Sequence, residues 1–304
     1  ARIRWNTGVL TLDPTRPLIV FGGPYSNLEA TDALFAEADR LGVPLSHVIC
    51  TGDVVAYAGD PEATSDRIRK SHVPIIAGNC EEQLANAAAD CGCGFDEGSA
   101  CDVLSKRWFA FADRSVSEMT RAWMRELPQD LWLSYAGRTF RVVHATSTSN
   151  NQFVFASETR SVASAYQACQ SEFVLAGHSG IPFVAKHGTG AWINAGVIGV
   201  PANDGTKDGW YAVISARDGD IEVAIKRLRY DAAAAAETMR MHGHANPYAD
   251  ALLTGHWPSL DVLPDAERAA SGVPIDEQCF VFPTATESGV EHLMTSEATA
   301  KRSA

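Results

Sequence analysis

Residues 18–30 read LIVFGGPYSNLEA. They begin with four apolar residues, which are typical of a buried strand, and continue into Gly22-Gly23-Pro24, which favours a tight loop. From Asn27 to Leu41 the apolar residues recur at helical spacing, and Gly42 then ends the predicted helix. A strand, a loop and a helix in this order predict the first unit of a layered α/β fold.

The next two apolar runs repeat this pattern. Residues 47–50 form a run that stops at Gly52-Asp53, and residues 73–77 form a run that stops at Gly78-Asn79. A short helix is predicted between them, over residues 61–70. Alternating strands and helices indicate a wound sheet, and ligands of such sheets bind outside the carboxyl ends of the strands.

The second half of the chain is predicted to be richer in strands. Apolar runs bounded by Gly, Asn or polar clusters occupy residues 131–135, 139–143, 173–176, 191–193, 210–215 and 221–228. They predict a second sheet that packs on the first. We therefore assign residues 1–230 to one domain, with a cysteine-rich insert at about 80–108. We assign residues 231–304 to a C-terminal helix and an irregular extension whose last dozen residues are frayed.

The composition restricts the classes of function. Hydrophobic residues make up 46% of the 304 residues and charged residues 20%, which is enough for a globular core. The formal net charge of -12 repels polyphosphate backbones, so we expect no nucleic-acid partner. We also expect no membrane span and no secretory signal, because no apolar stretch is long enough. The odd number of cysteines, seven, favours reduced thiols and a cytoplasmic location. The oligomeric state stays open.

Short polar motifs follow the predicted strands. They occupy residues 23–30 (GPYSNLEA), 52–57 (GDVVAY), 78–81 (GNCE), 142–145 (VVHA), 176–180 (AGHSG) and 193–201 (INAGVIGVP). Each motif alone is a weak signal, because a glycine and a polar residue after a strand most often form a turn. Together, at the ends of successive strands, they predict one shared site.

The order of these motifs resembles that of the calcineurin-like metallophosphoesterases, in particular the compact bacterial branch of phosphodiesterases and dinucleoside polyphosphatases. The resemblance covers roughly residues 18–228, and residues 27–30 and 199–201 fix its register. That family reads Asp-x-His-Gly-Asn, Gly-Asp, Gly-Asn-His, His, Gly-His-x-His and Asn-Pro-Gly-Ser-x-Gly-x-Pro. The resemblance implies an α/β fold, a four-layer α/β/β/α sandwich of two mixed β-sheets, and hydrolysis of phosphate esters by metal-activated water.

The departures from the family's pattern occur at the ligand positions of only one of the two metals. The resemblance implies two metals that share an aspartate, and the positions of three ligands of one metal are taken by Gly23, Tyr25 and Gly180. The protein ligands of the other metal are all present, namely Asp53, Asn79, His144 and His178. We therefore infer a mononuclear site with oxygen and nitrogen ligands, which suits a divalent Mn, Fe or Zn ion.

Further residues are candidates for contact with the substrate. Cys80 stands where the family has a proton-donating histidine, and a thiol is a weak donor but, as a thiolate, a metal ligand. Cys80 and His187 are candidates for contact with the leaving group, and Tyr25, Asn79 and Asn194 for other contacts with the substrate. Tyr25 most simply fills the space of the missing histidine. The alternative is a tyrosinate ligand to iron, as in the related purple acid phosphatases.

Four cysteines lie close together in the sequence, with the spacing Cys-x10-Cys-x-Cys-x7-Cys; they are Cys80, Cys91, Cys93 and Cys101. This spacing matches no standard zinc or iron–sulfur motif. Three interpretations stay open. The cysteines are reduced thiols on a surface loop, or they bind an additional zinc or iron ion, or some of them form a redox pair.

Two hypotheses from different classes describe the function. The first is a metal-dependent phosphoesterase that hydrolyses a small phosphate ester, either a monoester or a diester. The alternative is a catalytically weak member of the fold that binds a metal or a nucleotide for sensing or interaction, which the loss of the first-motif aspartate and of the proton donor suggests. A third possibility is redox or metal-transfer chemistry at the cysteine loop. Turnover of nitrophenyl phosphate esters distinguishes the first two.

Overall fold

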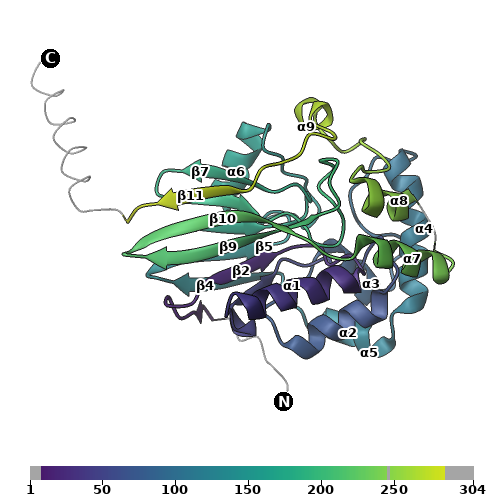
Figure 1. Cartoon of the computed structure of the whole chain (residues 1–304), viewed down its shortest axis with the longest axis horizontal. Helices are drawn as coiled ribbons and strands as arrows, with labels where there is room; N and C mark the ends of the chain where they lie inside the picture. The colour runs from purple at the N-terminus through teal and green to yellow at the C-terminus, as the bar shows by residue number, and fades with distance from the viewer. Residues whose placement is uncertain (1–7, 245–246, 285–304) are drawn as a thin grey trace, which may run out of the picture.

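The structure, a computed structural model, describes residues 8–244 and 247–284, and these residues form a pair of β-sheets that lie face to face (Figure 1). The strands are β1 (Leu10–Thr11), β2 (Leu18–Phe21), β3 (Val48–Cys50), β4 (Asp130–Tyr135), β5 (Arg138–Val143), β6 (Phe173–Ala176), β7 (Phe183–His187), β8 (Gly190–Asn194), β9 (Gly209–Arg217), β10 (Asp220–Leu228) and β11 (Gln278–Phe282). In the described residues, one sheet has the order β1-β4-β5-β6-β8-β7 and the other β11-β10-β9-β2-β3. Both sheets mix parallel and antiparallel pairs.

Helices cover the outer faces of both sheets, which gives the four predicted layers. The helices are α1 (Leu28–Arg40), α2 (Pro61–Ser71), α3 (Asn79–Ala85), α4 (Ala100–Ser115), α5 (Glu118–Arg125), α6 (Thr159–Cys169), α7 (Ala232–Met241), α8 (Pro247–Thr254) and α9 (Asp265–Ala269), and a short 3-10 turn covers Leu45–His47. Figure 1 shows α1, α2 and α5 packed together on the side of the sheet that contains β2. On the opposite side, α6 packs against the sheet that contains β8.

The core between the sheets is apolar and buried. Val20 and Ile49 from one sheet meet Phe140, Leu175 and their neighbours from the other. β2 and β3 are buried on both faces, because helices cover the face that the second sheet does not, and this explains why both read as continuous apolar runs. The two strands are parallel, so their carboxyl ends emerge at the same edge of the sheet.

The third predicted strand, over residues 73–77, is wrong as a strand. Only an isolated bridge between Ile75 and Cys50 remains of it. Pro74 has no backbone N–H to donate to a ladder, although its carbonyl accepts from the backbone N–H of Cys50 at 2.9 Å. The loop after this bridge still reaches the carboxyl end of β3, where the sequence predicts it.

The cysteine-rich insert is more regular than a loop. Its second half is the start of α4, where the Ser99 hydroxyl accepts from the backbone N–H of Asp102 at 3.2 Å and caps the helix. Trp108 and Phe109 on this helix are buried against the core that the helices share with the β2 sheet. The insert is therefore anchored to the domain rather than projecting from it.

The C-terminal segment is also more regular than predicted. After α7, the segment forms α8 and α9, and β11 then pairs antiparallel with β10 at the edge of the five-stranded sheet. The expectation of an irregular extension is wrong for these residues. β11 escapes prediction because most of its side chains are exposed and only Phe282 is buried. The last dozen residues of the chain, which we predicted to be frayed, lie outside the described residues. Residues 1–7 also lie outside them.

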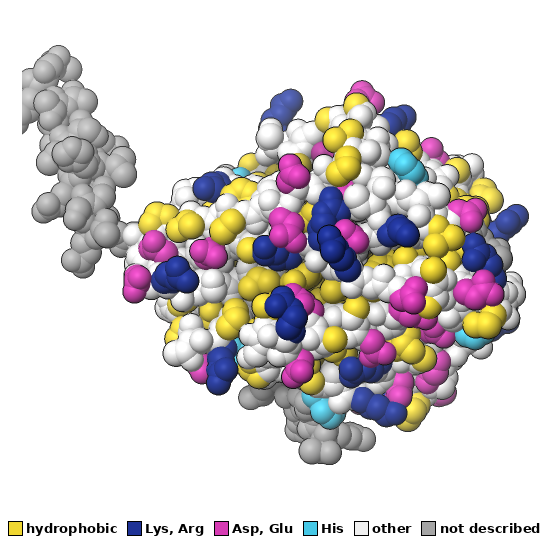
Figure 2. All heavy atoms as spheres, viewed as in Figure 1, with side chains coloured by type: hydrophobic (Ala, Val, Ile, Leu, Met, Phe, Trp, Pro, Cys, Tyr) yellow, Lys and Arg dark blue, Asp and Glu magenta, His cyan; other side chains and the backbone are white. Residues whose placement is uncertain are grey.

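No helix in residues 8–244 or 247–284 combines the length and the hydropathy that crossing a membrane requires. Figure 2 shows that acidic and basic side chains are interspersed over the face in view.

Candidate metal centre

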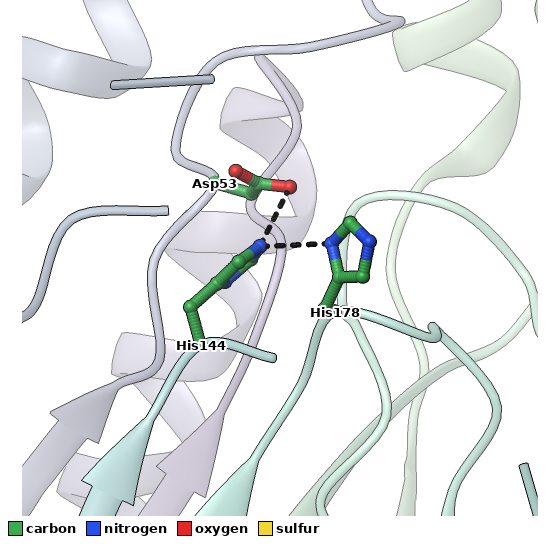
Figure 3. Close-up of side chains that lie close together, drawn as sticks. All are labelled: Asp53, His144 and His178. Atoms are coloured by element: carbon green, nitrogen blue, oxygen red, sulfur yellow. Dashed lines mark hydrogen bonds and ion pairs between the residues drawn. The ribbon is translucent and has the colours of Figure 1, made fainter. Parts of the chain in front are cut away.

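Four polar side chains meet near the carboxyl ends of strands from both sheets. Asp53 follows β3, Asn79 begins α3, His144 follows β5 and His178 follows β6. The Nε2 atom of His144 lies 3.3 Å from Asp53 Oδ2, 3.1 Å from Asn79 Oδ1 and 3.0 Å from His178 Nδ1. Figure 3 shows Asp53, His144 and His178 pointing toward one another. The structure thus brings together the four residues that the sequence suggests as ligands.

Hydrogen bonds outside this cluster determine which atoms face into it. His144 Nδ1 lies 2.7 Å from the carbonyl of Thr51, which can only accept, so Nδ1 carries a proton and Nε2 of the neutral ring offers a lone pair. Asn79 Nδ2 donates to the carbonyl of Cys91 at 2.8 Å, which leaves Oδ1 facing His144. One ring nitrogen therefore faces a carboxylate oxygen, an amide oxygen and a second ring nitrogen.

This donor set fits a divalent transition metal. A single proton on His144 Nε2 cannot satisfy both the Asp53 oxygen and the Asn79 oxygen, which can only accept, whereas one cation can bind these oxygens and the two ring nitrogens. The ligand atoms of Asp53, His144 and His178 lie within 4.8 Å of one another, and no other group of three His, Cys, Asp or Glu residues in the described stretches of the chain does so. All four side chains are buried, so leaving them without a cation or proton is unfavourable.

The charges of the cluster suit metal binding. Burial raises the pKa of the Asp53 carboxyl, but the charges of His144 and His178 and a hydrogen bond outweigh burial and hold that pKa below its usual range. Burial lowers the pKa of His144, but the Asp53 carboxylate raises it above its usual value. Burial and then the charge of His144 lower the pKa of His178 to about 3. Asp53 is thus charged and His178 neutral near pH 7, and a cation would take the place of a proton on His144.

The loop around Asp53 is tightly packed against the loop that contains Gly78. Asp53 has a left-handed backbone with φ 57°, which an aspartate tolerates better than most residues. A Cβ atom at Gly78 would lie 2.1 Å from Asp53 Oδ1, so only glycine fits there. The backbone N–H of Cys80 donates to the same Oδ1 at 3.1 Å. One carboxylate oxygen is therefore held by the backbone while the other faces His144.

Glu81 supports this loop and was not predicted from the sequence. Its buried carboxylate accepts from the backbone N–H of Asp53 at 2.7 Å, of Val54 at 2.8 Å, of Val55 at 3.3 Å and of Gly78 at 2.9 Å. Burial and then the Asp53 charge raise the pKa of Glu81 to about 7. The sequence does contain a signal for this role. Glu81 lies three residues after Gly78, and a glutamate at this spacing caps the start of a helix.

Comparison with known proteins gives the family. The model of the calcineurin-like phosphoesterase superfamily domain matches residues 25–219, which contain all four residues of the cluster. The chain belongs to this superfamily. Its structure is similar to that of a metallophosphoesterase from Sphaerobacter thermophilus, with 17% identity, a TM-score of 0.62, and coverage of 79% of this chain and 99% of that chain. It is also similar to a hypothetical protein from Pyrococcus horikoshii OT3, with 16% identity, a TM-score of 0.65, and coverage of 79% and 98%. These likenesses establish the fold, and no curated protein matches the sequence.

Aromatic rings lie against Gly23 and Gly180, two of the positions at which the sequence departs from the superfamily pattern. A Cβ atom at Gly23 would lie 2.6 Å from the ring of Tyr25, and a Cβ atom at Gly180 would lie 3.4 Å from the indole of Trp257. The ring of Tyr25 is buried and stands edge-on to Tyr57, with 4.7 Å between the ring centroids. Burial and then the Asp53 charge raise the pKa of Tyr25 in the metal-free chain well above its usual value. The contacts of its ring with Gly23 and Tyr57 agree with space filling.

A cavity opens beside the metal centre. It is lined by Asp53 and His178, by Ser179 and Ser259, and otherwise by cysteine, apolar and aromatic side chains, and it has a volume of about 50 Å³. Its aromatic lining residues are Tyr25, Tyr57, Phe95, Phe153, Tyr248 and Trp257. Sequence analysis named only Tyr25 among them as a candidate for contact with the substrate. Tyr57 lies within the motif over residues 52–57, and the other four lie outside the motifs, in segments that come together only in the fold.

Two predicted substrate contacts are not brought to the cavity. His187 pairs with Gly190 at the start of β8, the end of that strand opposite to Asn194, and its ring stacks on Tyr166 with 4.1 Å between centroids. The structure therefore gives His187 no contact with a leaving group. Asn194 lies at the correct end of β8, but its Oδ1 accepts from the backbone N–H of Gly196 at 3.0 Å, and it does not line the cavity. It shapes the loop rather than facing the substrate.

The cysteines do not form the metal cluster that the sequence left open. Cys91 and Cys93 form a disulfide, so the expectation that all thiols are reduced is wrong for this pair, and neither offers a thiolate. Cys80 is buried behind Asn79, with 3.6 Å between its Sγ and Asn79 Nδ2, and it does not line the cavity. Burial and then the Asp53 charge raise the pKa of the Cys80 thiol well above its usual value. Of the three interpretations, the disulfide agrees with a redox pair.

Proposed function

We propose that this chain hydrolyses a small phosphate ester at a site that holds one divalent transition metal ion. The observation that carries the proposal is the convergence of Asp53 Oδ2, Asn79 Oδ1 and His178 Nδ1 on His144 Nε2. Membership of a phosphoesterase superfamily whose members generally bind divalent metals supports the same interpretation. A single ion is supported by the rings of Tyr25 and Trp257, which take the space beside Gly23 and Gly180.

The side chains of the centre have separable roles. A bound divalent cation would supply a Lewis acid that polarises a phosphoryl oxygen and lowers the pKa of water. Asp53, Asn79, His144 and His178 would hold it, and the Thr51 carbonyl orients the ring of His144. The ester enters the cavity beside Asp53 and His178. The oxygen of water then bonds to phosphorus, the P–O bond to the leaving alcohol breaks, and the proton from water passes to the departing oxygen.

Leaving-group quality is expected to limit the rate. Cys80 and His187, the candidates for contact with the leaving group, do not line the cavity. Among the described lining residues, the Tyr25 phenol holds its proton too tightly to be an efficient acid at neutral pH. Esters of acidic alcohols need no proton from the protein when they leave. We therefore expect nitrophenyl esters to react faster than alkyl esters.

The test is turnover by protein from which metals have been removed by a chelator. The substrates are p-nitrophenyl phosphate and bis(p-nitrophenyl) phosphate, with Mn, Fe or Zn added separately, between pH 5 and pH 9. We expect a rate that appears with at least one metal and disappears on renewed chelation. If no metal gives a rate above background at any of these pH values, the chain is instead a binding member of the superfamily.

A further inference from the structure

We infer that the phenol of Tyr25 donates a hydrogen bond to a non-bridging oxygen of the phosphate ester at the metal centre. Tyr25 is then a catalytic residue that contacts the substrate, in addition to filling space beside Gly23. The inference rests on the proposed function for the identity of the site, and it assigns a donor that acts together with the metal ion. Three features of the described residues carry it: the position of the phenol, the backbone that holds it, and the shortage of other donors in the cavity.

The Tyr25 side chain lies beside the metal centre. Tyr25, Asp53 and His178 line the same cavity of about 50 Å³, which has room for a few water-sized atoms. Tyr25 is only 4% exposed, and its hydroxyl has no hydrogen-bond partner among the described residues. Leaving a buried polar group without a partner is unfavourable, and a phenol carries its proton near pH 7. A phosphoryl oxygen in the cavity would accept the hydrogen bond that the protein leaves unmade.

The backbone at Tyr25 is held in an unusual conformation. Tyr25 has a left-handed φ of 52°, which is rare for a bulky residue, and Ser26 follows with a φ of 61°. The backbone N–H of Tyr25 donates to the carbonyl of Asp53 at 3.2 Å, and its carbonyl accepts from the backbone N–H of Ala58 at 3.1 Å. These bonds tie the loop that carries the phenol to the loop that carries a metal ligand. Backbone strain that surrounding bonds maintain is typical of functional sites.

Close packing fixes the Tyr25 side chain before a substrate enters. A Cβ atom at Gly199 would lie 2.7 Å from Tyr25 Cβ, so the backbone of that glycine packs directly against it. On another side, the ring stands edge-on to Tyr57, with 4.7 Å between the ring centroids. A donor that is fixed in advance needs no reorganisation when negative charge develops on the phosphoryl oxygens. The hydrogen bond is therefore expected to be stronger in the transition state than in the bound ester.

The cavity offers few other donors to a phosphoryl oxygen. No lysine or arginine from the described residues lines it. The hydroxyls of Ser179 and Ser259, which do line it, each accept a hydrogen bond from a backbone N–H. The phenols of Tyr57 and Tyr248 are hydrogen-bonded to each other. Of these hydroxyl groups, the one on Tyr25 is left for the substrate.

The test is Tyr25→Phe, which removes the hydroxyl and keeps the ring. We expect the metal-loaded variant, freed of unbound metal, to bind inorganic phosphate about tenfold or more weakly than the wild type, as calorimetry measures it. We expect kcat/KM for p-nitrophenyl phosphate to fall about a hundredfold, the range for losing one preorganised donor. The metal content per chain is expected to stay at the wild-type value, because the phenol is a donor to the substrate and no ligand.

Tyr166→Phe is the matched control. Tyr166 lies on α6, its hydroxyl donates to the carbonyl of Glu172 at 3.0 Å, and it does not line the cavity. This variant is expected to keep the phosphate affinity and the kcat/KM of the wild type. A folded Tyr25→Phe protein that also keeps both would overturn the inference. Loss of the metal from Tyr25→Phe would overturn it as well, because Tyr25 would then be a ligand.

The binding data and the turnover data separate this inference from the proposed function. Metal-dependent hydrolysis that Tyr25→Phe leaves unchanged, together with unchanged phosphate affinity, would remove the inference and leave the proposed function standing. If the wild type hydrolyses no ester with any metal, the proposed function fails. The phosphate affinity of Tyr25→Phe then decides whether the phenol still contacts a phosphoryl oxygen at the metal centre.

Discussion

Asp53→Asn is expected to lower kcat/KM for a phosphate ester by about a thousandfold, which corresponds to about 4 kcal/mol of transition-state stabilisation. The asparagine keeps the shape of the side chain but removes the one negative charge of the ligand cluster. Asp53 Oδ2 lies 3.3 Å from His144 Nε2, and the ligand atoms of Asp53, His144 and His178 lie within 4.8 Å of one another. The measurement is steady-state hydrolysis of bis(p-nitrophenyl) phosphate, with the metal that supports the wild-type rate in excess.

This variant is expected to fold. Removing the Asp53 charge relieves its repulsion with the buried Glu81 carboxylate, whose pKa that charge raises. Asp32→Asn is the matched control, because Asp32 is exposed and its pair with Arg67 contributes at most about 1 kcal/mol. The control is expected to keep wild-type activity. A D53N protein that is folded and within a few-fold of the wild-type rate would show that Asp53 does not hold the catalytic metal.

Glu81→Ala is expected to lower the free energy of unfolding by about 3–5 kcal/mol, the range for removing one partner of a buried charged network. The carboxylate of Glu81 is the shared acceptor for the backbone N–H groups of Asp53, Val54 and Gly78. Its loss leaves these donors buried without a partner. The measurement is urea denaturation of the metal-free protein, followed by circular dichroism.

Two further variants sharpen this result. Glu82→Ala, on the next residue of α3, is the control, because Glu82 is only partly buried, and it is expected to change stability by less than about 1 kcal/mol. Glu81→Gln keeps one acceptor oxygen and is expected to fall between the other two. If Glu81→Ala is as stable as Glu82→Ala, the loop that carries Asp53 is held by something other than this carboxylate.

The portion of the site that the sequence predicted is the portion that depends on strand ends. Asp53, His144 and His178 each follow a buried strand. Asn79 follows a loop that reaches the carboxyl end of β3, the strand that precedes Asp53. An apolar run that stops at a glycine and a polar residue is visible without a structure, and parallel strands bring such ends to one edge. The predicted place of Asn79 was correct even though residues 73–77 form an isolated bridge rather than a strand.

The features that were missed depend on contacts between distant segments. Phe95, Phe153 and Trp257 come from three separate loops, and nothing in the local pattern marks any of them. β11 was missed because an edge strand needs few buried side chains to pair with its neighbour. His187 was misplaced for the opposite reason: it lies near the Gly-His motif in sequence, but β7 and β8 run antiparallel and carry it away from the site. The closeness of His187 to the Gly-His motif in sequence therefore did not predict closeness to the site in space.

Metal content per chain, measured by elemental analysis of the purified protein after dialysis against Mn, Fe or Zn, tests the central claim most directly. The arrangement of Asp53, Asn79, His144 and His178, with aromatic rings against Gly23 and Gly180, predicts one tightly held ion per chain in the wild type and less than about a tenth of that in Asp53→Asn. Two ions per chain, or one ion that Asp53→Asn retains in full, would contradict it.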